Sequence, residues 1–336
     1  MKIAVCFNQA PAVPVRGEQQ DRISESGAEL QAEAVAAALR LLNHDTTLIA
    51  LGNDIAPFVA ALQQLQPGMV FNLCEGFWGE SSGEMHVAAL FELLGLPYCG
   101  SAPLTLGLTQ DKALTKDLLA RHGLPTPNYL LVSPGEALPE LFELRWPVIV
   151  KPCLEDASLG ITEESIVSDR AALLARVQYI HERYRQAALV EEFIAGREFN
   201  AAVIGDLFPE ALPVSEICFR EGLSQQIVSY AGKWLEDSFE FDATEPVCPA
   251  ELAESERLII QQVALQACRL LGCRDYARVD IRLRDGIPYI LEVNANPDIS
   301  PDAGLARAAR AAGLEYPALL GRIVEMCCAR MEKPNA

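Results

Sequence analysis

Short apolar runs alternate with longer amphipathic stretches over the first hundred residues. The apolar runs have the length of strands, and the stretches between them repeat apolar residues at helical spacing. The strands are expected at 2–8, 46–51 and 69–75, and the helices at 27–42, 54–66 and 84–94. This β-α-β-α order predicts a parallel sheet. Ligands of such sheets lie beyond the carboxyl ends of the strands, so the loops that follow these ends, 8–25 and 76–83, are candidate substrate loops.

Two further units follow the first hundred residues. The second unit combines two helices near Lys112 with extended segments and a closing helix, and the third combines strands, a long helix, a hairpin and terminal helices. The extended segments of the second unit are 128–132 and 148–152, and its closing helix is 169–185. The third unit has strands around 188–206, a helix at 250–271, the hairpin at 276–298 and helices from 303 onward. We therefore expect an α/β fold that becomes α+β in its later part, with domains at 1–102, 103–190 and 191–336.

The hairpin carries the strongest chemical signal. Side chains alternate faces along a strand, so Arg278 and Asp280 share one face, as do Glu292, Asn294 and Asn296 on the second strand. The positions between them are mostly apolar. One surface can thus present a guanidinium, two carboxylates and two amides above an apolar underside. Such hard oxygen ligands suit Mg²⁺ bound with a phosphate-bearing substrate. The alternative is an ordinary hairpin with a solvated polar face.

The turn of this hairpin decides whether the two acids meet. A two-residue loop of Asp285 and Gly286 would pair Asp280 with Leu291 and leave Glu292 on the opposite face. A three-residue loop containing Gly286 would place Asp280 and Glu292 on the same face. The magnesium interpretation therefore predicts a loop of odd length.

Composition narrows the class of protein. The 336 residues include 27 basic and 46 acidic side chains, which give a net charge of −19. This charge argues against nucleic acids and anionic membranes as partners. No apolar run approaches the length of a membrane span, and MKIAVCFN resembles a first strand rather than a signal peptide. The ten cysteines form no C-x-x-C pair, which favours a reduced, cytoplasmic protein.

Further candidate groups precede the hairpin. VIVKP places Lys151 at the end of an apolar strand, before the loop at 153–160, where small residues let backbone N–H groups approach phosphate. Lys112 lies on a preceding helix. The segment ALVEEFIAGREFN offers Glu191, Glu192 and Glu198 near a strand edge that could meet an adenine and a ribose. Taken singly, each is equally consistent with a capping lysine, a solvated helix face or a surface hairpin. Together they resemble the parts of a phosphoryl-transfer site.

The ordered set of motifs resembles the ATP-grasp superfamily, and more narrowly its D-alanine–D-alanine ligase branch. The resemblance covers nearly the whole chain. It is carried by FELLGLPYCGS (91–101), DKALTK (111–116), WPVIVKP (146–152), LVEEFIAGREF (189–199), SYAGKWLEDS (229–238), ARVDIRL (277–283) and LEVNANPD (291–298). It implies a three-domain ATP-grasp architecture whose N-terminal parallel-sheet domain is Rossmann-like, with ATP held between the central and C-terminal domains.

The resemblance also implies roles for residues. Lys112 and Lys151 would bind ATP phosphates beneath the loop at 155–160. Glu191 and Ile194 would meet adenine through their backbones, beside Glu192, and Glu198 would hold the ribose. Asp280, Glu292 and Asn294 would coordinate Mg²⁺, with Mn²⁺ as the alternative metal. The catalytic residues would be Arg278, which stabilises developing charge, Lys233 in a lid, and Ser158, which remains of the loop's serine pair.

The implied reaction is ATP-dependent carboxylate–amine ligation, which forms an amide or peptide bond through an acyl phosphate. The partners would be amino acids or small peptides, and the family implies a homodimer. Departures from the family lie on the substrate side: EGFWGESSGE (75–84) replaces its His-Gly-x-Gly-Gly-Glu-Asp-Gly loop, Asp298 replaces a glycine, Ala303 a serine and Trp234 a tyrosine. Candidate substrate residues are therefore Glu75, Glu84 and Asp298, with Glu25 or Glu29 for an ammonium. The alternatives are an inactive ATP-binding sensor or scaffold and a small-molecule kinase.

Overall fold

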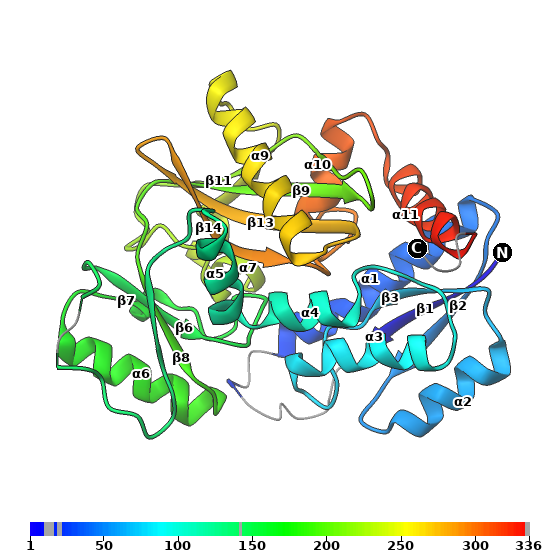
Figure 1. The fold of residues 1–336 in the computed structure, drawn as a ribbon, viewed down its shortest axis with the longest axis horizontal. Helices are drawn as coiled ribbons and strands as arrows, with labels where there is room; N and C mark the ends of the chain where they lie inside the picture. The colour runs from blue at the N-terminus through cyan, green and yellow to red at the C-terminus, as the bar shows by residue number, and fades with distance from the viewer. Residues whose placement is uncertain (10–16, 19–21, 141–142, 333–336) are drawn as a thin grey trace.

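The computed structural model describes residues 1–9, 17–18, 22–140 and 143–332, with the backbone alone described for 22–26. It contains three separate sheets, one in each third of the chain, and helices pack against all of them (Figure 1). No helix in these ranges is long and apolar enough to cross a bilayer.

The N-terminal sheet is parallel and has the strand order β2-β1-β3-β4. Its strands are β1 (Lys2–Asn8), β2 (Asp45–Leu51), β3 (Met69–Leu73) and β4 (Tyr98–Cys99), and its helices are α1 (Arg22–Leu41), α2 (Ile55–Leu65) and α3 (Glu84–Leu93). Alternate residues of β1 and β3 enter two different apolar clusters, one with α1 and the other with α2 and α3. Coverage of both faces explains why these strands are almost continuously apolar. The predicted parallel arrangement is confirmed, although α1 begins at Arg22 rather than at residue 27.

The central sheet is antiparallel, with the order β5-β8-β6-β7. It consists of β5 (Tyr129–Val132), β6 (Val148–Pro152), β7 (Ile166–Val167) and β8 (Ala188–Glu192), preceded by α4 (Pro103–Gln110) and α5 (Lys112–Arg121). Helix α6 (Arg170–Tyr184) packs Leu173, Val177 and Ile180 on one face of this sheet. Asp169 caps α6 by accepting a hydrogen bond from the Ala172 N–H. The predicted division at residues 190–191 falls inside β8, and both boundaries between the three domains stay predictions.

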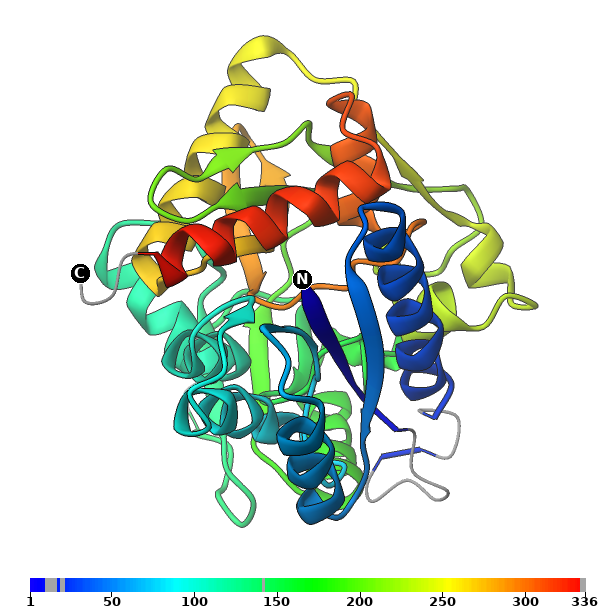
Figure 2. The same ribbon diagram turned by 90° about the vertical axis from the view of Figure 1, so that its right-hand side faces the viewer.

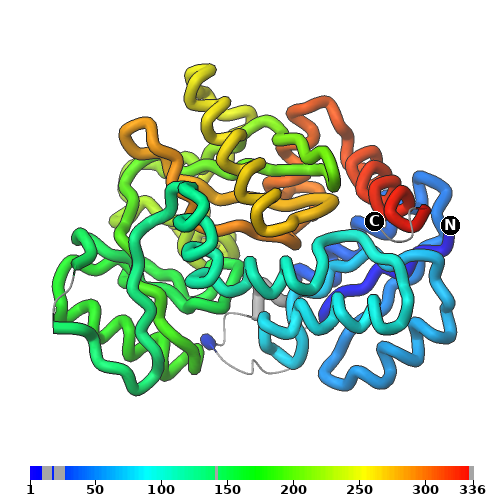
Figure 3. The backbone as a smooth tube through the Cα atoms, in the orientation of Figure 1, coloured from blue at the N-terminus to red at the C-terminus, as the bar shows by residue number. Residues whose placement is uncertain are grey.

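The C-terminal sheet is antiparallel along β12-β11-β9-β13-β14, and β10 pairs with β9. Its strands are β9 (Arg197–Gly205), β10 (Glu210–Ala211), β11 (Ser215–Phe219), β12 (Thr244–Val247), β13 (Asp275–Arg284) and β14 (Ile287–Asn294); its helices are α7 (Tyr230–Trp234), α8 (Phe239–Asp242), α9 (Glu254–Leu271), α10 (Gly304–Ala311) and α11 (Tyr316–Met331). Two short 3₁₀ turns, η2 (Ser81–Gly83) and η3 (Glu163–Ser165), lie in the earlier loops. In Figure 3 the chain passes from the N-terminal sheet through the central sheet and returns with α11 beside its start.

The β13–β14 hairpin brings Asp280 opposite Glu292, but not by the predicted route. Arg284 pairs with Ile287, so the loop has only two residues and the predicted odd loop is wrong. Asp285 and Gly286 both have positive φ, 54° and 74°, as a tight hairpin turn requires. A β-bulge at Leu291 supplies the missing residue, because the register shifts between Ile281 and Asp280. Beyond the bulge, each side chain of β14 points to the opposite face from the one that a regular strand would give it. Both acids therefore lie on one face.

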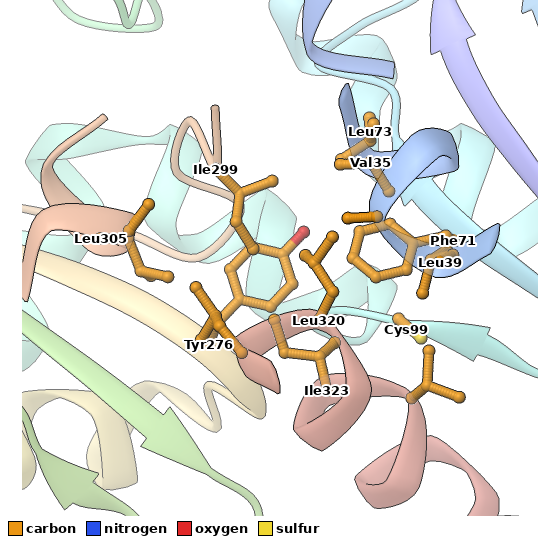
Figure 4. Packing of buried hydrophobic residues seen from close by; sticks show 14 of the residues in the cluster. Val35, Leu39, Phe71, Leu73, Cys99, Tyr276, Ile299, Leu305, Leu320 and Ile323 are labelled. Carbon is orange, nitrogen blue, oxygen red and sulfur yellow. The ribbon is translucent and has the colours of Figure 1, made fainter. Parts of the chain in front are cut away.

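One apolar core joins the N-terminal and C-terminal parts. Figure 4 shows Val35 and Leu39 of α1 and Phe71 of β3 close to Leu320 and Ile323 of α11 and to Tyr276 of β13. Figure 2 shows α11 running across this junction near α1.

A buried polar bridge reinforces the same junction. Asp275 is fully buried and accepts hydrogen bonds from the Gly100 N–H (2.7 Å) and from Arg330 of α11. The N-terminal sheet is thereby fixed relative to the hairpin that carries the candidate site.

Candidate active site

The proposed metal ligands of β13 and β14 converge in the structure. Asp280 lies opposite Glu292 and Arg278 lies opposite Asn294, all on one face of the hairpin. The Arg278 guanidinium donates two hydrogen bonds of 2.7 Å to the Asp280 carboxylate. Asn294 Nδ2 lies 3.2 Å from Asp280 Oδ2 and 3.4 Å from Glu292 Oε1. Asn200 of β9 donates a further bond of 2.7 Å to Asp280.

The pKa values of the two acids are shifted in opposite directions. Burial raises the pKa of Asp280, and the neighbouring carboxylate of Glu292 adds to that effect. Burial alone would also raise the pKa of Glu292, but the positive charges of Lys112, Lys151 and Arg278 hold it below its ordinary value. Two carboxyl groups in contact favour a shared cation.

This donor set fits Mg²⁺. Two carboxylates, joined by the Asn294 oxygen once that amide is flipped so that its Nδ2 points away from the acids, are the hard oxygen ligands that Mg²⁺ takes together with phosphate. The third donor is the amide of Asn294, and no group of three His, Cys, Asp or Glu side chains suited to a metal occurs in the described ranges.

Three lysines surround the approach to these acids. Lys112 Nζ lies 3.6 Å from Glu292 Oε2 and 2.8 Å from Asp156 Oδ1. Lys151 and Lys116 both contact Glu191 Oε1, at 3.0 and 3.1 Å, and all three side chains are buried. Burial, together with the charge of Lys151, lowers the pKa of Lys116 to about 8 even though Glu191 opposes the change. The lysines form a cationic wall next to the hairpin.

The loop after β6 contains a tight left-handed turn. Ala157 and Ser158 both have positive φ, 55° and 60°, which turns successive backbone groups to one side. Lys112 donates a hydrogen bond to the Glu155 carbonyl. The Ser158 carbonyl accepts from the Ile161 N–H at 3.0 Å. The loop therefore lies directly against Lys112, while its phosphate-binding role and the catalytic role of Ser158 stay predictions.

The segment predicted to bind adenine and ribose is held by Arg282. This buried arginine donates to Glu198 Oε2 at 2.7 and 2.9 Å and to the Ile194 carbonyl at 2.9 Å. Glu192 Oε1 accepts from the Arg145 N–H at 3.0 Å. Glu198 and Ile194 thus lie side by side, but part of their hydrogen-bonding capacity is already used within the protein.

The predicted lid is docked on the loop after β6. The Trp234 indole N–H donates to the Ala157 carbonyl at 2.9 Å, and the Tyr230 N–H donates to the Ile161 carbonyl at 2.9 Å. The Lys233 ammonium lies 5.2 Å from the centre of the Trp234 ring. Burial lowers the pKa of Lys233, and the charge of Arg278 acts in the same direction. Lys233 and Arg278 therefore face the same space.

A cavity of about 500 Å³ separates this machinery from the N-terminal sheet. Glu75, Glu84 and Asp298 all line it, together with Lys233 and Arg278. Asn296 donates to Glu84 at 2.9 Å, and Gln31 donates to Asp298 at 3.2 Å. The structure thus brings three of the predicted substrate residues to one cavity. Glu25 lies where only the backbone is described, so its side chain falls outside the described residues.

Several site residues have no obvious signal in the sequence. Lys116 follows Lys112 by one helical turn. Its sequence context predicts a solvated lysine, yet the side chain is almost fully buried. Gln186 is distant in sequence, but it donates to Glu155 Oε1 at 2.7 Å. Ser81 of the N-terminal loop donates to Glu155 Oε2 at 2.9 Å. Helical spacing could have linked Lys116 to Lys112, whereas the contacts of Gln186 and Ser81 depend on tertiary structure alone.

Comparisons with known proteins agree with this site. Residues 118–325 match the family model described as D-ala D-ala ligase C-terminus. An uncharacterized protein of Sinorhizobium fredii is 36% identical over 328 residues, which cover 95% of this chain and 91% of that protein. A D-alanine–D-alanine ligase of Pelotomaculum thermopropionicum is 32% identical over 304 residues, covering 88% of this chain and 90% of the ligase. The crystal structure of the D-alanine–D-alanine ligase from Bacillus anthracis complexed with ATP aligns with a TM-score of 0.78, 26% identity and 99% coverage of both chains.

Proposed function

The chain belongs to the D-alanine–D-alanine ligase family, whose architecture is ATP-grasp, and on that basis we propose that it joins a carboxylate to an amine at the expense of ATP. The observation that carries the proposal is the meeting of Asp280, Glu292 and Asn294 with Arg278 and Lys112 on one side of the β13–β14 hairpin. Acids, an amide and cations in that combination suit phosphoryl transfer, which depends on positioning and charge stabilisation.

Each residue of the site has a separate role in the proposed reaction. Lys112 and Lys151 bind ATP phosphates, and Glu191, which also pairs with Lys116, holds Lys151 in place. Asp280, Glu292 and Asn294 hold Mg²⁺, which when bound neutralises phosphate charge. Arg278, held beside Asp280, stabilises the developing negative charge of the substrate.

The proposed reaction has two stages. A substrate carboxylate takes the γ-phosphoryl group of ATP, which yields an acyl phosphate and ADP. An amine then attacks the acyl carbon, and phosphate leaves. The Trp234 contact with Ala157 keeps α7 closed on the loop, so that water does not reach the acyl phosphate.

The substrates are small molecules that fit the cavity. Its wall contains Asp298, whose carboxylate accepts from Gln31 and from the Ser300 N–H at 2.8 Å. Ala303, at the start of α10, has no hydroxyl to grip an acceptor carboxylate. These residues support an amine acceptor whose recognition differs from that of D-alanine. The homodimer and the cytoplasmic location stay predictions.

The test is incubation of the purified chain with ATP, Mg²⁺ and pooled D- and L-amino acids, with products read by mass spectrometry. We expect a new amide and ADP in equal amounts. Glu292→Gln should reduce product at least about 100-fold, the scale expected for loss of a charge-stabilising group, while circular dichroism stays unchanged. Glu33→Gln, an exposed acid on α1, is the matched control. A stable phosphorylated product formed without an amine would indicate a kinase, and nucleotide binding without turnover would indicate a sensor.

A further inference from the structure

Glu75 is held at the carboxyl end of β3 by a clamp from β1. Asn8 Oδ1 accepts from the Glu75 N–H at 2.7 Å, and Asn8 Nδ2 donates to the Gly76 carbonyl at 2.9 Å. One side chain therefore fixes the peptide group before Glu75 and the peptide group after Gly76. The carboxyl ends of neighbouring parallel strands are where ligands of such sheets bind. The Glu75 side chain lines the cavity from this position.

The loop that follows Glu75 is compact and preformed. Phe77 and Glu80 exchange two backbone hydrogen bonds of 3.0 Å around a tight turn. A Cβ on Gly83 would lie 2.6 Å from the Phe77 nitrogen, so the loop folds back on itself at this point. Preorganised groups of this kind hold a functional side chain in a single position.

The Glu75 carboxylate is free for a ligand, whereas neighbouring acids are engaged. It accepts no hydrogen bond and makes no salt bridge within the described part of the chain. By contrast, Glu84 accepts from Asn296, Asp298 from Gln31, and Asp280 from Arg278. Glu75 therefore has its carboxylate available to a ligand in the cavity, whereas these three acids already have partners within the protein.

Charged groups from four other segments face Glu75. These are Asp298 before α10, Lys233 of α7, Asp156 after β6 and Arg278 of β13. Burial raises the pKa values of three further titratable neighbours well above their ordinary ranges: Glu84 of α3, Tyr276 of β13 and Cys74 beside Glu75. Glu75 thus stands close to Arg278 and Lys233, the two cations assigned above to the reacting end of the cavity.

Given the proposed ligase reaction, we infer that Glu75 accepts a proton from the amine of the second substrate. The amine arrives as an ammonium, whose nitrogen has no lone pair for attack. Transfer of one proton to the Glu75 carboxylate creates the neutral nucleophile, which forms the C–N bond as the bond between the acyl carbon and phosphate oxygen breaks. The nitrogen loses two protons in all: one goes to Glu75 and then to solvent, and the other leaves with phosphate as HPO₄²⁻.

The acidity of Glu75 suits this role. The side chain is open to the cavity, but protein atoms surround it closely enough to remove part of its hydration. This desolvation, together with the negative charge of Asp298, raises the pKa of Glu75 to about 7. A general base works best when its pKa lies near the operating pH. As the proton acceptor must be ionised, the rate of amide formation should fall as pH drops below 7.

Hydroxylamine separates this role from the rest of the reaction. It is already uncharged at neutral pH and traps an acyl phosphate as a hydroxamate without first losing a proton. The full-length chain and Glu75→Gln are each given ATP, Mg²⁺ and pooled D- and L-amino acids, with and without hydroxylamine. Hydroxamate is read by its iron(III) colour, and amide is read by mass spectrometry.

We expect Glu75→Gln to lose about 100-fold or more of amide formation, the usual contribution of a general base, and to keep its hydroxamate rate within about threefold. Its residual amide rate should keep rising with pH above 7, because it depends on the fraction of free amine, whereas the wild-type rate should level off there, and Glu75→Asp should restore part of the activity. Equal loss of both products would overturn the inference, because it would place Glu75 in the first stage or in the fold. If the wild-type chain forms no hydroxamate, the ligase function itself fails and the inference falls with it.

Discussion

The Glu191 carboxylate forms ion pairs with two buried lysines. The loss of folding stability that follows from removing its charge can be calculated. Glu191→Gln takes away the only carboxylate within 4 Å of Lys116 or Lys151 among the described residues. Breaking a buried ion pair by removal of one partner costs about 3–5 kcal/mol. Lys116 keeps hydrogen bonds to the Thr126 hydroxyl and the Leu291 carbonyl, at 3.0 and 3.2 Å. These remaining bonds favour the lower end, about 3 kcal/mol at pH 7.

Urea denaturation followed by circular dichroism measures this loss. The matched control is Glu245→Gln, which makes the same chemical change in a pair with Arg220 whose side chains are 62% and 55% exposed. Exposed pairs contribute only about 0–1 kcal/mol. We therefore expect Glu191→Gln to lower the free energy of unfolding by at least about 2 kcal/mol more than Glu245→Gln does.

The pH dependence provides a second, independent check. Burial already lowers the pKa of Lys116 to about 8, and loss of Glu191 lowers it further. The folded variant then releases this proton at a lower pH than the unfolded chain does. Since the unfolded chain binds more protons there, the stability of the variant rises with pH. The deficit relative to wild type should narrow from pH 7 to pH 9. A loss equal to that of the control, or a deficit independent of pH, would refute this account of the lysine cluster.

Two other substitutions test the hairpin and the lid. Gly286→Ala should cost about 1 kcal/mol in urea denaturation, because the new Cβ meets nothing within 4 Å and only the backbone conformation at φ 74° is penalised; no measurable loss would argue against the tight turn. Trp234→Phe removes the indole N–H that binds the Ala157 carbonyl, so more acyl phosphate should be lost to water and the ratio of ADP to amide should rise; an unchanged ratio would show that this contact does not close the site.

Sequence reasoning captured the features that local chemistry determines. Apolar alternation located the strands and helices to within a few residues in most cases, because burial of one face sets both periods. The same alternation placed Arg278 beside Asp280, and these residues form the predicted shared face. The order of motifs gave the family, which the comparisons confirm.

The remaining features depend on tertiary structure. The hairpin loop has two residues. The bulge at Leu291, rather than the predicted loop of odd length, places Asp280 and Glu292 on the same face. Ile290 and Leu291 are tied to the segment before β5 through the Pro125 carbonyl, the Thr126 hydroxyl and Lys116, contacts that no strand pattern reveals. Likewise, Ser81 reaches Glu155 only because the loop at 76–83 lies against the loop after β6. Long-range contacts of this kind cannot be derived from spacing within one segment.

Transfer of labelled oxygen tests the central claim most directly. The chain is supplied with ATP, Mg²⁺ and an amino-acid pool carrying ¹⁸O in its carboxylates, and the phosphate and amide are analysed by mass spectrometry. If the hairpin acids and the lysines position a carboxylate for attack on ATP, one ¹⁸O atom appears in phosphate for each amide formed. Phosphate without label, or labelled phosphate never matched by amide, would contradict the assignment of this site to carboxylate–amine ligation.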